Sequence, residues 1–303
     1  MSHTHERPLF SEFGGSSDKN VPWYTRDVDD SKISKPAREL LQTYSGIPAD
    51  EILPHVLAMR DRAWSIHPYP CIGRLRFLDL SIIQHPLFQT LIPRLQSSQT
   101  LLDLGCCFGQ DIRALVAAGA PAQNLYGADL RPEYTQLGYD LFKDRDRLQA
   151  TFFSANIFAD QEGTDADPDD DGKTENGFAP LRGKLDIIHA ASFFHLFSLN
   201  EQRALARRLI ALLRPLPGSL VIGRQAGNVV AGEMPSRSDP SKTTFRHNGD
   251  SWWDMWDAVG RETGTEWRTE VGLKEVEGWS SGMGTEEGRG EGDRMMVFAV
   301  HRL

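Results

Sequence analysis

The chain has few cysteines and no apolar stretch as long as a membrane span. Only three of its 303 residues are cysteines, and two of these, Cys106 and Cys107, are neighbours. Adjacent cysteines are too close for ordinary disulfide geometry, and the spacing of the three is not that of a zinc site. We therefore expect neither a disulfide framework nor a bound metal.

The sequence also lacks an excess of positive charge. Its 42 acidic residues outnumber its 33 basic residues, which gives a net charge of -9 and a pI near 5.5. This balance gives no general attraction to nucleic acid and favours a small-molecule partner. The polar first residues have no signal-peptide pattern, and no apolar run of about 18 residues occurs. We expect a cytoplasmic protein without stable membrane insertion.

The first third of the chain predicts an arm and a helical cap. Residues up to about 30 are polar, apart from the aromatic pair Trp23 and Tyr24. The spacing of apolar residues predicts helices at 35–44, 49–64 and 73–95, with Pro86 as an interruption of the last one. We interpret residues 1–97 as an N-terminal arm and helical cap over the active site.

From residue 100 onward, short apolar runs alternate with helical patterns, which predicts an α/β fold with a parallel sheet covered on both faces. We expect strands at 100–104, 124–128, 150–154, 185–190 and 218–223, a helix at 200–213, and a closing hairpin formed by 271–277 and 294–301. The acidic stretch 160–177 is too polar for a core and lacks EF-hand spacing, so a surface insertion is expected. Residues 98–303 would then form the cofactor-binding domain.

The most informative segment, residues 101–111, has the pattern of a buried strand, a glycine turn and a helix start. A dinucleotide site needs G-x-G-x-x-G to approach a pyrophosphate, whereas Gly105 and Gly109 give G-x-x-x-G. This wider turn favours S-adenosylmethionine, an adenosine cofactor without phosphate. Asp129 closes the next apolar run, where a carboxylate can accept hydrogen bonds from both ribose hydroxyls.

Five segments together are more specific than the glycine turn. They resemble fungal S-adenosylmethionine-dependent methyltransferases of meroterpenoid biosynthesis, and they are Pro68-Tyr69-Pro70-Cys71-Ile72-Gly73, Leu102-Asp103-Leu104-Gly105-Cys106-Cys107-Phe108-Gly109-Gln110-Asp111, Leu137-Gly138-Tyr139-Asp140-Leu141-Phe142, Phe194-His195-Leu196-Phe197 and His247-Asn248-Gly249-Asp250-Ser251-Trp252. The resemblance implies the class I methyltransferase fold, a Rossmann-like seven-stranded sheet that is mostly parallel with an antiparallel last strand. It also implies a homodimer, and an enzyme that converts the carboxylate of a farnesylated polyketide acid to a methyl ester.

The resemblance assigns the cofactor site residue by residue. The implied cofactor-binding residues are Asp103, Gly105, Cys106, Gly109, Asp129, Leu130, Asn156, Ile157 and Phe158. The chain departs from the family at two positions, since Asn156 stands where an acidic residue is usual and Cys107 where a glycine is common. The amide oxygen of Asn156 can still accept a hydrogen bond from the adenine amine.

The substrate side is less specific. A carboxylic acid is already ionised at neutral pH, whereas a phenol needs a base. His189 lies at the end of the fourth predicted strand and His195 just beyond it, at the edge where sheet ligands bind. We predict that they orient the acceptor or remove its proton. The alternative is a structural histidine at a strand end. The predicted substrate residues, for most of which plain packing or a surface charge is the alternative, are Tyr24, Trp64, Tyr69, Arg76, Phe193, Arg224, His247 and Trp252.

Two other functions compete with ester formation. One is O-, N- or C-methylation of another fungal secondary metabolite, and the other is a non-catalytic methyltransferase-like binding subunit. Both cofactor acids, Asp103 and Asp129, are present, and so are the two histidines, which favours an enzyme. The ring system of the acceptor and the dimer surface stay open.

Overall fold

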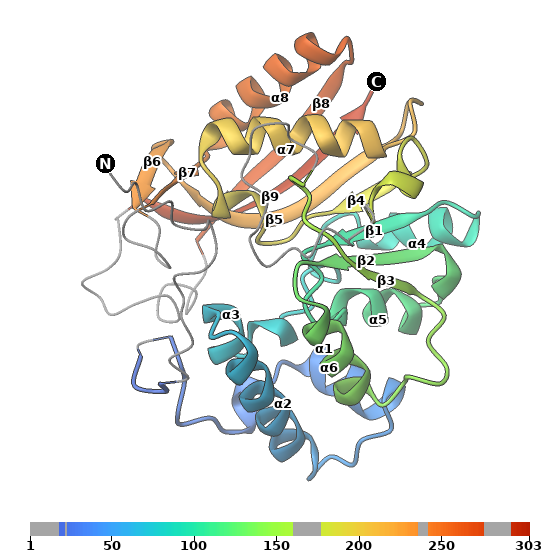
Figure 1. The fold of residues 1–303 in the computed structure, drawn as a ribbon, viewed down its shortest axis with the longest axis vertical. Coiled ribbons are helices and arrows are strands. Elements are labelled where there is room, and N and C mark those ends of the chain that lie inside the picture. Colours follow the sequence, from blue (N-terminus) through green and yellow to red (C-terminus); the bar gives the residue numbers. More distant parts are fainter. Residues whose placement is uncertain (1–17, 22, 160–176, 236–241, 276–291) are drawn as a thin grey trace, which may run out of the picture.

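A computed structural model describes residues 18–21, 23–159, 177–235, 242–275 and 292–303. In this part of the chain a seven-stranded sheet has the order β3-β2-β1-β4-β5-β9-β8 (Figure 1). The first five strands pair in parallel and are β1 Leu101–Leu104, β2 Leu125–Asp129, β3 Thr151–Ser154, β4 Ile187–His189 and β5 Leu220–Asn228. β9 (Asp293–Arg302) is antiparallel to both β5 and β8 (Trp267–Lys274). The predicted mostly parallel sheet with an antiparallel last strand is confirmed.

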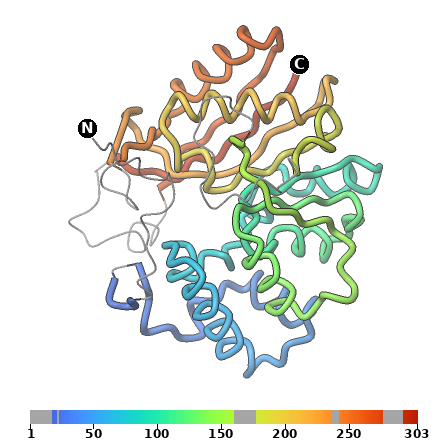
Figure 2. The backbone as a smooth tube through the Cα atoms, in the orientation of Figure 1, coloured from blue at the N-terminus to red at the C-terminus, as the bar shows by residue number. Residues whose placement is uncertain are grey.

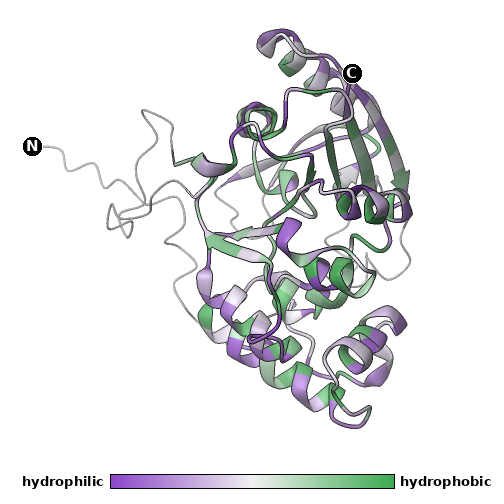
Figure 3. Cartoon of the chain, turned by 90° about the vertical axis from the view of Figure 1, so that its right-hand side faces the viewer, coloured by the Kyte–Doolittle hydropathy of each residue, from purple (hydrophilic) through white to green (hydrophobic). Residues whose placement is uncertain are grey.

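Helices cover both faces of this sheet. One face and the N-terminal segments share a hydrophobic core that includes α5 (Gln110–Ala117) and α6 (Pro132–Phe142). The other face packs against α7 (Leu199–Leu212) and α8 (Gly249–Thr263). Strands of the main sheet include strongly hydrophobic stretches, while the helices show both hydrophilic and hydrophobic residues (Figure 3). The central strand β1 is buried along its whole length, as expected for a parallel strand covered on both sides.

The N-terminal helices are α1 (Lys35–Glu39), which continues into η2 (Leu40–Tyr44), then α2 (Ile52–Ile66), α3 (Pro70–Gly73) and α4 (Phe88–Gln96). α2 packs against α6, and the two lie side by side (Figure 2). The predicted helices at 35–44 and 49–64 are confirmed in type. No helix in the described part of the chain has the length and apolar character needed to cross a bilayer.

The predicted helix over 73–95 is confirmed after its interruption at Pro86, where α4 follows, and is wrong for residues 74–87. Only the short 3-10 turn η3 (Arg76–Leu78) lies between α3 and α4, and residues 79–87 are turns. Leu75 and Leu80 have positive φ angles of 58° and 45°. A right-handed helix cannot pass through left-handed residues, so the apolar spacing of this segment reflects packing, not helical periodicity.

A small antiparallel ribbon, β6 (Gly232–Pro235) with β7 (Thr243–Arg246), was not predicted. The pairing of β8 with β9 confirms the predicted hairpin strands, whose connection lies outside the described residues. Residues 160–176 of the predicted acidic insertion and residues 1–17 of the predicted arm also lie outside them.

The described part of the arm is fixed to the cap. The Tyr24 hydroxyl donates a hydrogen bond to Asp61 on α2, and the Thr25 N–H donates to the Gly73 carbonyl at 3.0 Å. Gly73 permits this approach, because a Cβ there would lie 2.3 Å from the Trp23 carbonyl oxygen. The arm is therefore part of the packed structure from Trp23 onward.

His85 joins the cap to the sheet in its neutral form. Its Nε2 donates to the Phe298 carbonyl on β9 at 3.0 Å, and its Nδ1 accepts from the Leu87 N–H at 3.2 Å. Burial lowers the pKa of His85 to about 4. Because the unfolded chain then binds a proton first, the free energy of unfolding falls as the pH drops from about 6.5 towards 4.

For His85 alone we expect a loss of about 2 kcal/mol between pH 7 and pH 5. The measurement is urea unfolding of the wild type and of His85→Gln at both pH values. The variant is expected to be less stable at pH 7 but to lose less stability on acidification. Equal losses in the two proteins would contradict a neutral, hydrogen-bonded His85.

Candidate active site

The loop between β1 and α5 has three left-handed residues at alternate positions. Gly105, Cys107 and Gly109 have φ angles of 72°, 53° and 65°. The pattern read from the sequence as G-x-x-x-G is therefore G-x-C-x-G in backbone conformation, with Cys107 at the position of the usual middle glycine. A non-glycine residue in this region costs of order 1 kcal/mol, which the surrounding contacts must offset.

Both glycines of this loop are closely approached by side chains. A Cβ on Gly105 would lie 2.7 Å from the Phe193 ring, and one on Gly109 would lie 2.6 Å from Phe152. Phe193, predicted as a substrate residue, therefore lies across the first glycine of the loop, just after β4. Cys106, predicted as a cofactor residue, is buried, and its N–H donates to the Ala128 carbonyl at 3.1 Å.

Asp129 joins this loop to the end of β2. Its Oδ2 accepts from the Cys107 N–H at 2.8 Å and its Oδ1 accepts from the Arg131 N–H at 3.0 Å. Burial raises the pKa of Asp129, while these two backbone donors oppose the shift. The side chain is half-buried at the carboxyl end of its strand, where the sequence predicted a ribose-binding carboxylate.

The other predicted cofactor residues line the next strand end. Asn156 Oδ1 accepts from the Phe158 N–H at 2.9 Å, so the loop already uses the oxygen that we expected to meet adenine. Ile157 is buried, and the Phe158 ring packs edge-on against Phe197. The Leu130 carbonyl accepts from Ser154 Oγ at 3.1 Å, which ties β2 to β3.

The cap segment at 67–73 approaches the same place. Burial raises the pKa of the Tyr69 phenol, and a hydrogen bond with Arg131 opposes this shift. The structure therefore brings Tyr69, predicted as a substrate residue, to the ribose end of the cofactor site.

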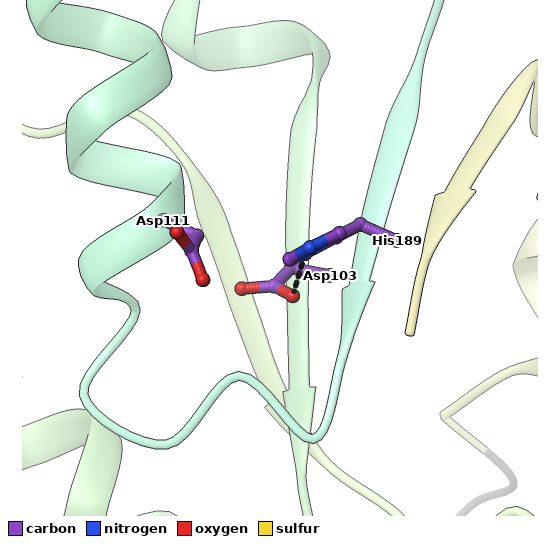
Figure 4. A group of neighbouring side chains, drawn as sticks. All are labelled: Asp103, Asp111 and His189. Carbon is purple, nitrogen blue, oxygen red and sulfur yellow. Dashed lines mark hydrogen bonds and ion pairs between the residues drawn. The ribbon is translucent and has the colours of Figure 1, made fainter. Parts of the chain in front are cut away.

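Behind the loop lies a buried polar cluster of Ser81, Asp103, Asp111 and His189. Asp103 stands between the other two residues drawn in Figure 4. His189 Nδ1 donates to Asp103 Oδ1 at 2.8 Å. Ser81 Oγ donates to Asp111 Oδ2 at 2.7 Å and lies 3.4 Å from His189 Nε2. Asp111 Oδ1 accepts from the Ile82 N–H at 3.0 Å, so the cluster joins the cap to the first turn of α5.

This cluster encloses the first of the two predicted catalytic residues. His189 is only 1% exposed, and both of its ring nitrogens face protein groups. Burial lowers the pKa of His189, but the charge and hydrogen bond of Asp103 raise it by more. The pKa of His189 therefore lies above the ordinary value. His189 therefore faces the interior in this structure and is placed to orient Asp103.

The same residues have metal-ligand chemistry, with one atom of each of Asp103, Asp111 and His189 within 4.8 Å of the others. Hydrogen bonds from Ser81, Ile82 and His189 already occupy Asp111 and one oxygen of Asp103. The remaining oxygen, Asp103 Oδ2, is buried with no hydrogen-bond partner among the described residues.

Arg224 on β5 contacts two residues of the N-terminal segment, Asp79 and Gln84. Its Nη2 donates to Asp79 Oδ2 at 2.9 Å and its Nη1 donates to Gln84 Oε1 at 3.1 Å. Arg76 Nε donates to the same oxygen of Asp79 at 3.2 Å. Arg76 and Arg224, both predicted from the sequence, are thus brought together by a carboxylate that the sequence reasoning did not single out.

The remaining predicted substrate residues are packed in the protein interior. Trp64 and Trp252 are buried in the two cores, and Tyr24 of the arm packs edge-on against Trp64. His247 Nδ1 is hydrogen-bonded to Ser251 Oγ at 2.9 Å, and burial lowers the pKa of His247 to about 3. Since protein encloses these side chains, we leave them out of the proposed acceptor site.

His195, the second predicted catalytic residue, is half-buried in the 3-10 turn η6 (Phe194–Leu196). Its carbonyl accepts a hydrogen bond from Arg246 Nη1, which fixes the turn against β7. Ser81, Asp79, Asp111 and Arg131 were missed as site residues. Asp79 and Ser81 lie within the segment 73–95 that was predicted as a helix, and no local pattern marks them.

Known proteins resemble this chain over most of its length. Residues 23–78 match the family model described as the meroterpenoid methyltransferase N-terminal domain. O-methyltransferase phiE of a fungal species (strain ATCC 74256) is 40% identical over 86% of this chain and 81% of that protein. O-methyltransferase atr3 of Stereocaulon alpinum is 39% identical over 95% and 78% of the two chains. The asnovolin E/chermesin D methyltransferase nvfJ of Aspergillus novofumigatus is 36% identical over 89% and 90%.

This similarity extends well beyond the glycine turn, and the strand order and cofactor loop described above agree with it. The chain belongs to the fungal meroterpenoid methyltransferases, a family of S-adenosylmethionine-dependent enzymes with the class I fold.

Proposed function

We propose that the protein transfers the methyl group of S-adenosylmethionine to a carboxylate oxygen of a farnesylated aromatic polyketide acid, giving a methyl ester. The observation that carries the proposal is the enclosure of His189, which removes this histidine as the base that a phenol would require. A carboxylate needs no base, because it is already ionised at neutral pH.

The residues of the cofactor loop fit the cofactor. The left-handed Gly105, Cys107 and Gly109 let the backbone approach a ligand, and Asp129 presents a half-buried acceptor for ribose hydroxyls. S-adenosylmethionine supplies the electrophilic methyl and leaves as a neutral thioether. Tyr69 of the cap is hydrogen-bonded to Arg131, which follows β2, and lies near Asp129.

The protein's contribution to the reaction is positioning and the exclusion of water. The acceptor carboxylate gives an electron pair to the methyl carbon while the bond from carbon to sulfur breaks, and no proton moves. Holding the two groups in line can supply about 7 to 11 kcal/mol of the barrier. Phe193, which lies across Gly105, is placed to form part of the wall around the two groups.

Methylation of a phenol is the second candidate, and His195 is the residue that favours it. This histidine is half-buried in the turn η6 after β4, two residues after Phe193. If the acceptor is a phenol, His195 takes up its proton, and the rate has a pH-dependent limb that His195→Gln abolishes.

Two blocked acceptors separate these candidates. In 3-farnesyl-4-methoxybenzoic acid only the carboxyl group can be methylated, and in methyl 3-farnesyl-4-hydroxybenzoate only the phenol can be. We expect the wild type and His195→Gln to methylate the acid with the same pH profile, and neither to methylate the ester. Methylation of the phenolic compound, with the limb lost in His195→Gln, would contradict the carboxylate proposal.

We also propose that the enzyme acts in the cytoplasm as a homodimer, as the family resemblance implies. Light scattering of the purified protein tests the dimer, and a mass of 33.9 kDa at all concentrations would contradict it.

A further inference from the structure

Two cationic side chains share one carboxylate oxygen at the junction of cap and sheet. Arg224 Nη2 and Arg76 Nε lie 2.9 Å and 3.2 Å from Asp79 Oδ2. The side chains of Arg224 and Arg76 are only 13% and 17% exposed, so water screens their charges weakly. One carboxylate oxygen of Asp79 therefore binds two guanidinium groups.

The two guanidinium groups are close enough for the charge of Arg224 to affect the pKa of Arg76. Burial lowers the pKa of Arg76, Asp79 opposes this, and the like charge of Arg224 lowers it further. Arg224 also has an unused donor, because its Nε is buried with no hydrogen-bond partner in the described part of the chain. A buried donor without a partner costs about 1–3 kcal/mol, which a bound oxygen would recover.

The cluster lies at the ligand edge of the sheet. The Arg224 carbonyl on β5 accepts from the Ser192 N–H in the loop after β4, and Phe193 in that loop crosses Gly105 of the cofactor turn. Asp79 is fixed from the cofactor side, since Ser81 and Ile82, two and three residues further on, both donate to Asp111. The geometry of the charges is therefore set by the same helix that follows the cofactor loop.

We propose that Arg224, supported by Arg76 and Asp79, is the specificity-determining site that binds the carboxylate of the acceptor. This inference rests on the proposed function, because it names the groups that hold the acid which the reaction methylates. Both Nη atoms of Arg224 already donate to protein oxygens, so Nε offers a single-point contact. One carboxylate oxygen is then held and the other keeps its electron pair for the methyl carbon.

Asp79 has two opposing effects in this site. It orients both guanidinium groups, and it also competes with the acceptor for their charge. Removing a cation and removing the counter-ion should therefore change the affinity for an acid in opposite directions. A role in folding alone would make both substitutions harmful, which gives the test its discriminating power.

The test is calorimetric titration of 3-farnesyl-4-methoxybenzoic acid and of its primary amide, with S-adenosylhomocysteine present at saturation. For Arg224→Gln we expect the Kd of the acid to rise by about 10- to 100-fold, the size of a lost hydrogen bond to a charged group, and that of the amide to stay within about twofold. For Asp79→Asn we expect tighter binding of the acid, with a steeper dependence on salt. Arg62→Gln is the matched control, because Arg62 pairs with Asp140 between α2 and α6 and should change neither Kd.

Equal affinity of the wild type for acid and amide would overturn the inference. So would a parallel loss of both ligands in Arg224→Gln and Asp79→Asn. If Arg224→Gln does not fold, the test uses Asp79→Asn and Arg224→Lys. The lysine keeps the positive charge but lacks the guanidinium donors. Failure of the proposed function is seen separately, as absence of binding to S-adenosylhomocysteine or of methyl transfer to an acid that binds.

Discussion

Replacement of Arg113 by methionine is expected to lower the free energy of unfolding by about 3–5 kcal/mol, the usual cost of breaking a buried ion pair from one side. Arg113 and Asp144 are both fully buried, and the arginine binds the carboxylate with two hydrogen bonds of 2.7 and 2.8 Å. Tyr44 of the cap donates to the same carboxylate at 2.8 Å. The methionine would leave Asp144 buried with its charge uncompensated.

The same substitution should loosen the cofactor loop, because Arg113 Nη1 donates to the carbonyls of Phe108 and Gly109 at 2.6 and 3.2 Å. Urea unfolding measures the stability, and Arg62→Met is the matched control. Its exposed pair with Asp140 should contribute at most about 1 kcal/mol. The double variant Arg113→Met with Asp144→Leu should recover much of the loss, since it leaves no unpaired charge. A loss in Arg113→Met no larger than in Arg62→Met would contradict this account.

The second large effect is expected at Asp129. In Asp129→Ala the N–H groups of Cys107 and Arg131 lose their acceptor, so the loop loses a support that offsets the left-handed conformation of Cys107. The ribose hydroxyls lose a charged acceptor as well. Hydrogen bonds to charged groups contribute about 1.5–3 kcal/mol, so we expect the Kd for S-adenosylhomocysteine to rise by about 100-fold or more.

Calorimetric titration with S-adenosylhomocysteine measures this change. Asp129→Asn, which keeps one oxygen acceptor, should lose less affinity than Asp129→Ala. Asp140→Ala, which removes the partly exposed pair of Asp140 with Arg62 between α2 and α6, is the control and should bind like the wild type. A Kd for Asp129→Ala within about twofold of the wild type would place the ribose elsewhere.

Much of the fold was predictable because its signals are local. Each inner strand is a short apolar run that is buried on both faces, and the glycine turn, the acid at 129 and the helix after it follow one another in sequence. The prediction for the cap failed just before Pro86, where the spacing of apolar residues does not correspond to a helix. Residues 73–95 have helical spacing, but the left-handed Leu75 and Leu80 turn the chain so that its apolar side chains fill the core without a continuous helix.

The site was predictable only in part, for a similar reason. The sequence placed histidines at the end of β4 correctly, but it could not show that Asp103, Asp111 and Ser81 would enclose His189 from three separate elements. Asp79 becomes a candidate site residue only through its contact with Arg224, which is 145 residues away in the chain. The left-handed conformation of Cys107 was not predicted, since cysteine is not a residue that indicates a positive φ angle.

Transfer of a labelled methyl group tests the central claim most directly. The wild type is incubated with S-adenosylmethionine that carries a trideuterated methyl and with 3-farnesyl-4-hydroxybenzoic acid, which offers a free carboxyl and a free phenol in one molecule. The account predicts a singly labelled product whose label is lost on mild alkaline hydrolysis, as for a methyl ester. A label that survives hydrolysis as an aryl ether, or no labelled product although S-adenosylhomocysteine binds, would contradict it.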